Sequence, residues 1–278
     1  MRIFVTGGTG FIGSHFLHEA LSEGHDLVAI KRKNSEPRIP LGHEPRWVEG
    51  DLEADYSEEL SGCDTLVHLA GYGVDPKDSD WQESFRWNVD ASLQLWLSAI
   101  NAGVKRLVIC GSCFEYGKSG EGQELISTTT PLLPQSSYAA SKAAASMLAV
   151  GLAASKNVEV VILRPFHVFG EGESAHRLWP SLRKSALAGE DFKMTKGEQI
   201  RDFIPVEKVV KDILNAVDSE LLNTGAVIKN VGTGKPQSIL EFSKFWWDHF
   251  EAKGKLLIGA IDYRENEVMR YVPQIDDE

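Results

Sequence analysis

The chain has 278 residues, of which 42% are hydrophobic and 25% charged, and its formal net charge is −11. This length and composition are typical of one large or two modest globular domains that bury a substantial core. The acidic balance excludes nucleic acid as an expected partner, because phosphate backbones attract basic surfaces.

No hydrophobic run is long enough to span a bilayer, and no charged leader precedes the first apolar stretch. We therefore expect a cytoplasmic protein with no membrane partner. The three cysteines, Cys63, Cys110 and Cys113, are an odd number without metal-type spacing. They predict reduced thiols in a cytoplasmic protein, and the sequence shows no metal site.

The first segment of the chain combines a strand, a glycine turn and a helix. Residues 1–5 are rich in apolar residues that favour a strand, the run TGGTGFIG follows at 6–13, and a helical pattern comes next. Gly7 permits a tight turn, Gly10 lets the backbone approach a pyrophosphate, and Gly13 lets the helix pack closely. Loops also collect glycine for turns alone, but this position between strand and helix predicts a dinucleotide site at the helix N-terminus.

A second strand is predicted at 26–30, and it ends in Lys31-Arg32-Lys33. A base at this point accommodates the 2′-phosphate of NADP, whereas NAD-preferring folds usually carry an acid there. The run therefore favours NADP(H), with Arg32 as the main ligand because a guanidinium can both stack on adenine and fork onto phosphate. NAD remains possible, and the alternative for the basic run is a solvated loop.

Strands and helices alternate through the first part of the chain. Further strands are predicted at 46–52, 65–69, 106–109 and 158–163, and helices at 81–102 and 136–156. This alternation is typical of an α/β fold with a doubly wound parallel sheet, the Rossmann arrangement. We expect a dinucleotide-binding domain at 1–164.

The periodicity is weaker after residue 164. Helices are predicted near 177–188, 206–218 and 238–253, with short strands near 192–195 and 226–230. We expect residues 165–278 to form a smaller α/β substrate lobe that is partly interleaved with the first domain.

A candidate acid–base pair follows the fifth predicted strand. Ser112 lies in a loop after this strand, and Tyr138 and Lys142 lie four residues apart in the next predicted helix. Residues at i and i+4 share a helix face, which places the ammonium beside the phenol. An adjacent positive charge lowers the pKa of a phenol and makes it a usable acid or base. The spacing alone is a weak motif, but its position in a dinucleotide fold adds weight.

The order and spacing of the motifs resemble the extended short-chain dehydrogenase/reductase family, in particular its NAD(P)-dependent sugar-nucleotide epimerases, dehydratases and 4-ketoreductases. The matching stretches are TGGTGFIG at 6–13, GDL at 50–52, HLAG at 68–71, NVDAS at 88–92, SCFEYG at 112–117, YAASK at 138–142, RPFHVFG at 164–170 and RDFIPV at 201–206. The resemblance covers nearly the whole chain, and it implies a homodimer through the long helices at 81–102 and 136–156.

The resemblance implies a role for each matching residue. Ser112 matches the catalytic Ser/Thr that bonds the reacting sugar oxygen, Tyr138 the general acid/base, Lys142 the residue that holds the nicotinamide ribose, and Asn88 the asparagine that supports this lysine through water. The implied cofactor-binding residues are Gly7, Gly10, Phe11, Ile12, Gly13, Lys31, Arg32, Asp51, Leu52, Leu69, Ala70, Gly71, Tyr138 and Lys142.

The resemblance also implies contacts with a nucleotide-sugar substrate. Arg201 and Arg264 fall where relatives bind the diphosphate, although each arginine is alternatively explained by a surface ion pair with Asp202 or Glu267. His167 stands where an asparagine is common, and it either bonds the phosphate or sugar or is a satisfied core histidine. The implied substrate-binding residues are Ser112, Cys113, His167, Arg201 and Arg264.

One departure from the family pattern narrows the reaction. Dehydratases of this family carry an Asp-Glu pair directly after the catalytic Ser/Thr, whereas this chain has Cys113 and Phe114, so a 4,6-dehydratase is not expected. We expect NADPH-dependent reduction of the C4 keto group of a nucleotide-linked 4-keto-6-deoxyhexose. The alternatives are a C4 epimerase with tightly bound NAD(P) and, less favoured because Ser112, Tyr138 and Lys142 are intact, a non-catalytic NADP-binding regulator.

Overall fold

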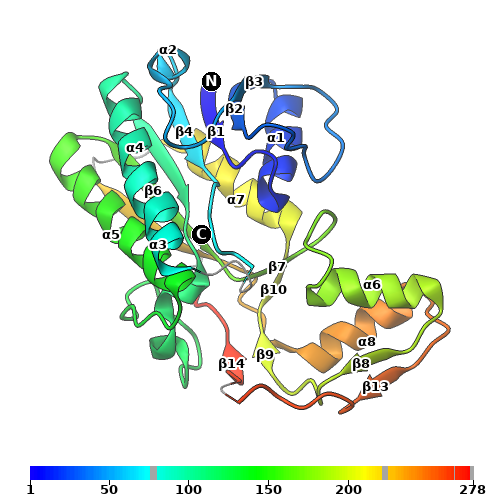
Figure 1. The fold of residues 1–278 in the computed structure, drawn as a ribbon. Coiled ribbons are helices and arrows are strands. Elements are labelled where there is room, and N and C mark those ends of the chain that lie inside the picture. The colour runs from blue at the N-terminus through cyan, green and yellow to red at the C-terminus, as the bar shows by residue number, and fades with distance from the viewer. Residues whose placement is uncertain (76–79, 221–224, 266, 276–278) are drawn as a thin grey trace.

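Seven parallel strands form the main sheet of the protein, in the order β11-β6-β5-β4-β1-β2-β3. The computed structural model describes residues 1–75, 80–220, 225–265 and 267–275 (Figure 1). The strands are β1 (Arg2–Thr6), β2 (Asp26–Lys31), β3 (Arg46–Glu49), β4 (Thr65–His68), β5 (Arg106–Cys110), β6 (Glu159–Pro165) and β11 (Ala226–Val231). The predicted doubly wound α/β fold is confirmed, because every neighbouring pair in this sheet is parallel and helices cover both faces.

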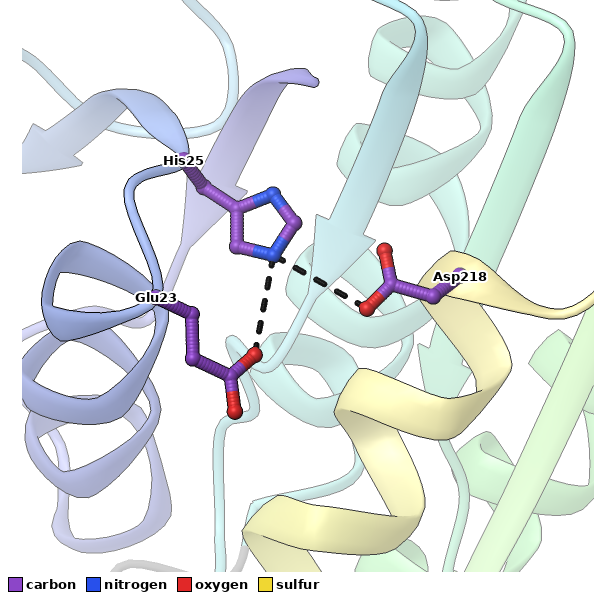
Figure 2. Close-up of side chains that lie close together, drawn as sticks. All are labelled: Glu23, His25 and Asp218. Atoms are coloured by element: carbon purple, nitrogen blue, oxygen red, sulfur yellow. Dashed lines mark ion pairs between the residues drawn. The ribbon is translucent and has the colours of Figure 1, made fainter.

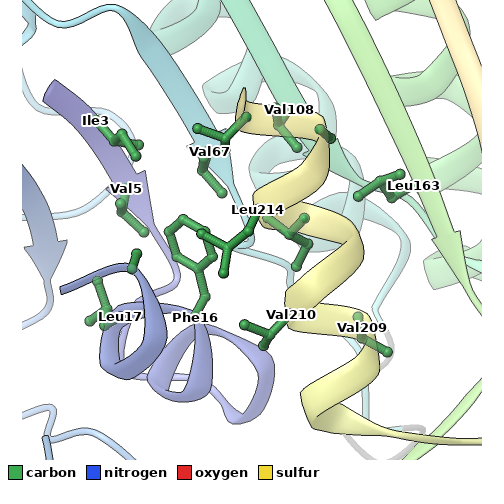
Figure 3. Close-up of a cluster of buried hydrophobic side chains, with 14 of the residues drawn as sticks. Ile3, Val5, Phe16, Leu17, Val67, Val108, Leu163, Val209, Val210 and Leu214 are labelled. Atoms are coloured by element: carbon green, nitrogen blue, oxygen red, sulfur yellow. The ribbon is translucent and has the colours of Figure 1, made fainter. Parts of the chain in front are cut away.

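Helices α1 (Phe11–Ser22) and α7 (Val206–Asp218) cover one face of the sheet. Figure 3 shows Phe16 of α1 and Leu214 of α7 among side chains that project from the sheet. The buried residues of α7 recur every three or four positions, which is the spacing of one helix face. Burying each large aliphatic side chain of this kind contributes roughly 1.5–3 kcal/mol.

The other face is covered by α5 (Ser137–Lys156) and by a long helical segment that the sequence predicted as one helix. That segment consists of α3 (Trp81–Phe85), a π-helical stretch η2 (Arg86–Ala91) and α4 (Ser92–Asn101). Helix α5 begins where predicted, because the Ser136 side chain accepts a hydrogen bond from the Ala139 N–H at 3.2 Å. The small helix α2 (Ser57–Leu60) precedes β4.

Two elements from beyond residue 164 belong to the main sheet and its helical cover. Helix α7 packs against α1, and β11 pairs with β6 from Ala226 opposite Val160 to Val231 opposite Pro165. A division of the chain at residue 164 would assign both elements to the smaller lobe, whereas they complete the main sheet and the core on one of its faces. The two parts are therefore interleaved along the chain.

The smaller lobe contains α6 (Leu178–Ala188), α8 (Ile239–His249) and several short strands. Strand β8 (Phe192–Met194) pairs with β13 (Leu256–Ile258), and β7 (His167–Phe169) pairs with β10 (Phe203–Pro205). Strand β9 (Ile200–Arg201) lies between β12 (Gln237–Ser238) and β14 (Arg270–Tyr271). Most of these strands were not predicted, because segments of two or three residues are too short to show a period. Among the described residues, no helix is long and apolar enough to cross a membrane.

A charged cluster joins the ends of α1 and α7 at the opposite edge of the sheet from the strand carboxyl ends. Figure 2 shows His25 between Glu23 and Asp218, and its Nε2 atom lies 3.8 Å from a carboxylate oxygen of each. A histidine at helix C-termini is favourable when it carries a positive charge. We interpret this cluster as an ion-pair contact that ties the two helices together.

Candidate active site

The candidate site lies beyond the carboxyl ends of the strands, where the strand order reverses between β1 and β4. Ligands of doubly wound sheets bind at such a switch point. The glycine run after β1, the residues after β4 and β5, the first turns of α5 and the residues after β6 all reach this edge. They carry most of the residues that the sequence singled out.

The glycine run forms a cradle that side chains would fill. Gly7 has φ +71°, and a Cβ there would lie 2.5 Å from the backbone nitrogen of Ala70. A Cβ on Gly13 would lie 2.0 Å from the carbonyl oxygen of Gly7. Helix α1 has Gly10 as its N-cap with no side-chain hydrogen bond, so its first N–H groups face a potential anion. These features fit the pyrophosphate of a dinucleotide.

Substituting Gly13 by alanine is expected to weaken NAD(P)H binding by about tenfold or more and to lower stability by about 1–3 kcal/mol, because the added methyl overlaps the turn. Fluorescence titration and thermal unfolding would measure both effects. Gly151→Ala in α5 is the matched control, since nothing lies within 4 Å of its new Cβ. Unchanged cofactor affinity in Gly13→Ala would contradict this account of the cradle.

The basic run after β2 is only partly available to a cofactor. Lys31 Nζ lies 3.1 Å from Glu36 Oε1 and 5.1 Å from the centre of the Trp47 ring, so Lys31 already has partners. Arg32 is exposed. Both residues stay predicted cofactor ligands, and Arg32 is the main candidate because Lys31 already contacts a carboxylate and an indole.

The other predicted cofactor residues lie in two loops. Asp51 is exposed and its Oδ1 accepts a hydrogen bond from the Glu53 N–H at 3.0 Å, while Leu52 packs against the core on the α4–α5 face. Leu69 packs against the core on the α1–α7 face, and the Ala70 N–H donates to Thr6 Oγ1 at 3.3 Å. The second loop lies directly against Gly7 of the cradle.

Ser112 and Tyr138 form the polar centre of the site. Ser112 caps the short 3₁₀ segment Cys113–Tyr116, and its Oγ accepts a hydrogen bond from the Phe114 N–H at 3.2 Å. The Ser112 hydroxyl also hydrogen-bonds the Tyr138 phenol. Because Oγ accepts from the backbone, its own proton is the one donated to the Tyr138 phenol, or to a sugar oxygen that takes that position beside the phenol.

The expected effect of Lys142 on Tyr138 is not found. Burial, followed by the nearby thiol of Cys110, raises the pKa of Tyr138 above its ordinary value, and the hydrogen bond from Ser112 only partly opposes this rise. The Lys142 ammonium instead donates to the carbonyl oxygen of Cys110 at 2.6 Å and is itself buried. The helix spacing placed lysine and tyrosine on one face, but an acceptor from β5 determines where the ammonium points.

Asn88 lies in the π-helical stretch η2 and is buried. Its Nδ2 donates to Ser141 Oγ at 2.9 Å and to the Tyr72 carbonyl at 3.0 Å, and its Oδ1 accepts from the Tyr72 N–H at 2.8 Å. Asn88 therefore fixes the loop after β4 against the turn of α5 that carries Lys142. Single π turns inside helices occur frequently at functional sites.

A buried ion pair under Ser112 was not predicted. Arg164 Nε donates to Glu115 Oε2 at 2.8 Å, and the Ser112 N–H donates to Glu115 Oε1 at 2.8 Å. Arg164 also donates to the Tyr116 hydroxyl at 3.0 Å. Burial raises the pKa of Glu115, and the Arg164 charge opposes this effect. The only sequence signal was a charged residue at the end of an otherwise apolar strand.

The charges of two arginines, Arg201 and Arg177, act on the predicted substrate residues His167 and Cys113. Burial is the main cause that lowers the pKa of His167 to about 3, and the charges of Arg201 and Arg177 add to it. The same two arginines act on the buried Cys113 thiol, whose pKa burial raises to about 12. Arg177 was missed by the sequence analysis, since an arginine in a loop before a helix is unremarkable.

The contacts of His167 and Arg201 bear on the alternatives that the sequence left open for them. His167 is not a satisfied core histidine, because its Nδ1 is buried with no hydrogen-bond partner among the described residues. Arg201 donates to Glu267 Oε1 at 3.2 Å and to the Val268 carbonyl at 2.6 Å. Arg201 thus forms an ion pair with Glu267 in this structure. Asp202 instead accepts from the Thr233 N–H at 2.9 Å.

Arg264 is exposed, and its neighbour Asn266 lies outside the described residues. At this part of the predicted substrate pocket, the structure thus shows only that Arg264 is exposed to solvent. Its expected contact with a diphosphate stays a prediction.

Comparison with known proteins identifies the family. The family model of the NAD dependent epimerase/dehydratase family matches residues 3–232 of the chain. The chain belongs to this family. The resemblance read from the sequence is thereby confirmed, and the protein is an enzyme.

Three proteins illustrate the similarity. CDP-abequose synthase of Salmonella muenchen is 28% identical over 271 residues, which cover 96% of this chain and 87% of the relative. The UDP-N-acetylglucosamine 4-epimerase of Methanobrevibacter ruminantium M1, solved with UDP-N-acetylmuramic acid, has a TM-score of 0.88 at 26% identity and covers 99% of this chain and 89% of its own. MoeE5, solved with UDP-glucuronic acid and NAD, has a TM-score of 0.84 at 29% identity and covers 99% and 90%.

Proposed function

We propose that this enzyme reduces the C4 keto group of a nucleotide-linked 4-keto-6-deoxyhexose with NADPH. The observation that carries the choice of NADPH is the exposed Arg32 directly after β2, and Ser112 beside Tyr138 supplies the polar centre that the reduction needs. The residues after Ser112 are a buried thiol and an exposed phenyl ring, Cys113 and Phe114, and neither suits acid–base elimination of water. The site thus offers one proton donor and one hydroxyl to a carbonyl oxygen.

The glycine cradle and Arg32 would hold the dinucleotide, with Lys142 near its nicotinamide ribose. When bound, NADPH supplies the hydride that reduces a carbonyl carbon. Ser112 would orient the carbonyl oxygen, and Tyr138 would give its phenolic proton to that oxygen as negative charge develops. With its pKa raised by burial, the Tyr138 phenol carries its proton at neutral pH, as a general acid must before it donates.

Arg177 and Arg201 would bind the substrate diphosphate, helped by the unpartnered Nδ1 of His167. Guanidinium groups form paired, charge-assisted hydrogen bonds to phosphate oxygens. Arg201 would then exchange its present contact with Glu267 for a phosphate oxygen. Asn88 would act by holding the α5 turn that carries Lys142.

A C4 epimerase is the second candidate, favoured by the 4-epimerase named among the similar structures and by the NAD present in the MoeE5 complex. Such an enzyme takes a hydride from C4 and returns it to the other face, so it retains its cofactor through the cycle. The same Ser112, Tyr138 and Lys142 would serve it. Cofactor use therefore separates the two reactions better than the polar centre does.

The nicotinamide released on denaturing the purified enzyme, together with titrations of NADPH and NADH, tests the proposal. We expect exchangeable binding with an NADPH preference, and Arg32→Ala should weaken NADPH binding by about tenfold or more and NADH binding by much less, since NADH has no 2′-phosphate and loses only the stacking on adenine. Lys156→Ala, at the far end of α5, is the control. Tightly retained NAD⁺, or no effect of Arg32→Ala, would favour the epimerase.

We also propose that the chain forms a homodimer through α4 and α5, as the resemblance implies. Met147 of α5 is 56% exposed, which leaves an apolar side chain for such a contact. Light scattering that gave a monomer at micromolar concentration would contradict this proposal.

A further inference from the structure

The loop between β7 and α6 carries an acid–base pair next to the candidate substrate site. Glu173 Oε1 lies 3.6 Å from Arg177 Nε, and the two residues are one helical turn apart. The Glu173 side chain is 9% exposed, whereas that of Arg177 is 42% exposed. The second carboxylate oxygen of Glu173 is buried with no hydrogen-bond partner among the described residues. A nearly buried carboxylate thus depends on a single, half-exposed arginine.

Arg177 lies near two of the candidate substrate residues. Its charge acts on the imidazole of His167 and on the thiol of Cys113, the residue next to Ser112. Arg177 is therefore close enough to the polar centre to meet the phosphates of a substrate that reaches Ser112. The loop is also held over the nucleotide-binding part, because His15 Nε2 of α1 lies 2.9 Å from the Glu171 carbonyl oxygen and His176 lies 3.3 Å from Asp75.

Glu173 lines a cavity of about 400 Å³ together with the charged side chains of Glu171, Arg183 and Lys184. Burial raises the pKa of Glu173 to about 7, even though the charge of Arg177 opposes this rise. Arg183 lies over the Trp179 ring at 5.8 Å, so its position is set by that contact. The charge of Glu173 is therefore maintained mainly by Arg177.

We propose that Glu173 is a positioning residue that holds Arg177 in the free enzyme and releases it to the substrate diphosphate by taking up a proton from solvent. This inference rests on the proposed function, because it requires a nucleotide-sugar diphosphate in the site. A phosphate and a carboxylate compete for one guanidinium. Once the phosphate binds Arg177, the buried carboxylate loses its counter-charge, and a buried carboxylate without a partner is protonated rather than charged.

Proton uptake and substrate affinity should both depend on pH in a defined direction. With a free-enzyme pKa of about 7, Glu173 is already protonated in most molecules at pH 6 and charged in most at pH 8. Proton uptake on substrate binding should therefore rise from about 0.1 at pH 6 to about 0.5 at pH 7 and about 0.9 at pH 8. Affinity should fall about tenfold from pH 6 to pH 8, because only the protonated fraction releases Arg177 without cost.

His176, the residue before Arg177, is also able to take up a proton, and so is His167. The His167 pKa of about 3 lies below the experimental range. A rise in this pKa on diphosphate binding would give an uptake that is largest at pH 6 and declines toward pH 8. Glu173 and His167 thus predict opposite pH trends.

Isothermal titration calorimetry of the enzyme with saturating NADP⁺ tests the inference. UDP-glucose, CDP-glucose and dTDP-glucose are used as probes, since their diester phosphates do not titrate between pH 6 and pH 8. Each titration is run in buffers of different ionisation enthalpy, which gives the number of protons taken up. Glu173→Gln should abolish the uptake and make affinity independent of pH, whereas Glu171→Gln, an exposed acid of the same cavity, should behave like the native enzyme.

Each other outcome has a defined meaning. Binding without proton uptake in the native enzyme, or an uptake that survives Glu173→Gln, would overturn the inference and leave the proposed function intact. An uptake that grows toward pH 6 would assign the proton to His167 and overturn the role of Glu173. Failure of all three probes to bind would overturn the proposed function and this inference with it.

Discussion

Replacing Tyr138 with phenylalanine is expected to lower turnover by about 10²–10⁴-fold while NADPH still binds. The phenol is the only group hydrogen-bonded to Ser112 that can give a proton to a sugar oxygen among the residues described at the site. Phenylalanine keeps the ring and its packing but removes that proton. The rate of NADPH oxidation with a panel of nucleotide-linked 4-keto-6-deoxyhexoses, together with a binding titration, would measure the two effects separately.

Tyr263→Phe is the matched control, because its hydroxyl hydrogen-bonds Glu198 at 2.8 Å in the smaller lobe and takes no part in the polar centre. It should leave turnover within about twofold of native, as expected for a surface substitution. Equal turnover in Tyr138→Phe and native enzyme would show that another group donates the proton. A native enzyme that binds NADPH but oxidises it with no member of the panel would instead favour the epimerase.

Replacing Glu115 with glutamine is expected to lower the free energy of unfolding by about 3–5 kcal/mol. The side chains of Glu115 and Arg164 are 0% and 1% exposed, so the neutral amide leaves a buried guanidinium charge without compensation. Glu115 also accepts from the Ser112 N–H. The variant should therefore lose turnover as well, because the backbone that aims the Ser112 hydroxyl is no longer held in place. Urea unfolding and the NADPH oxidation assay would measure these effects.

The pair between Arg86 and Glu53 provides the comparison, since its side chains are 49% and 43% exposed. Glu53→Gln should cost no more than about 1 kcal/mol, the range of solvent-exposed ion pairs. If Glu115→Gln were as stable as Glu53→Gln, the buried pair would contribute little, and the position of Ser112 would have to depend on its capping contact with Phe114 alone.

The dinucleotide cradle and the order of the core elements were predictable because they depend on local chemistry. Glycine at positions 7 and 13 is required by a positive φ and by backbone contacts that leave no room for a side chain. The alternation of apolar strands with amphipathic helices led to a doubly wound sheet, as observed. The separation of Tyr138 and Lys142 by four residues determined that they share one face of α5.

The contacts of the polar side chains at the site depend on the tertiary structure. The β5 carbonyl of Cys110 takes the ammonium of Lys142, and burial raises rather than lowers the pKa of Tyr138. Glu115 and Arg164 are 49 residues apart in the chain, and no periodic pattern links them. A sequence pattern reports which face of an element is apolar. The desolvation and the partner of a single polar side chain depend on which distant segments pack around it, and only the folded arrangement determines these.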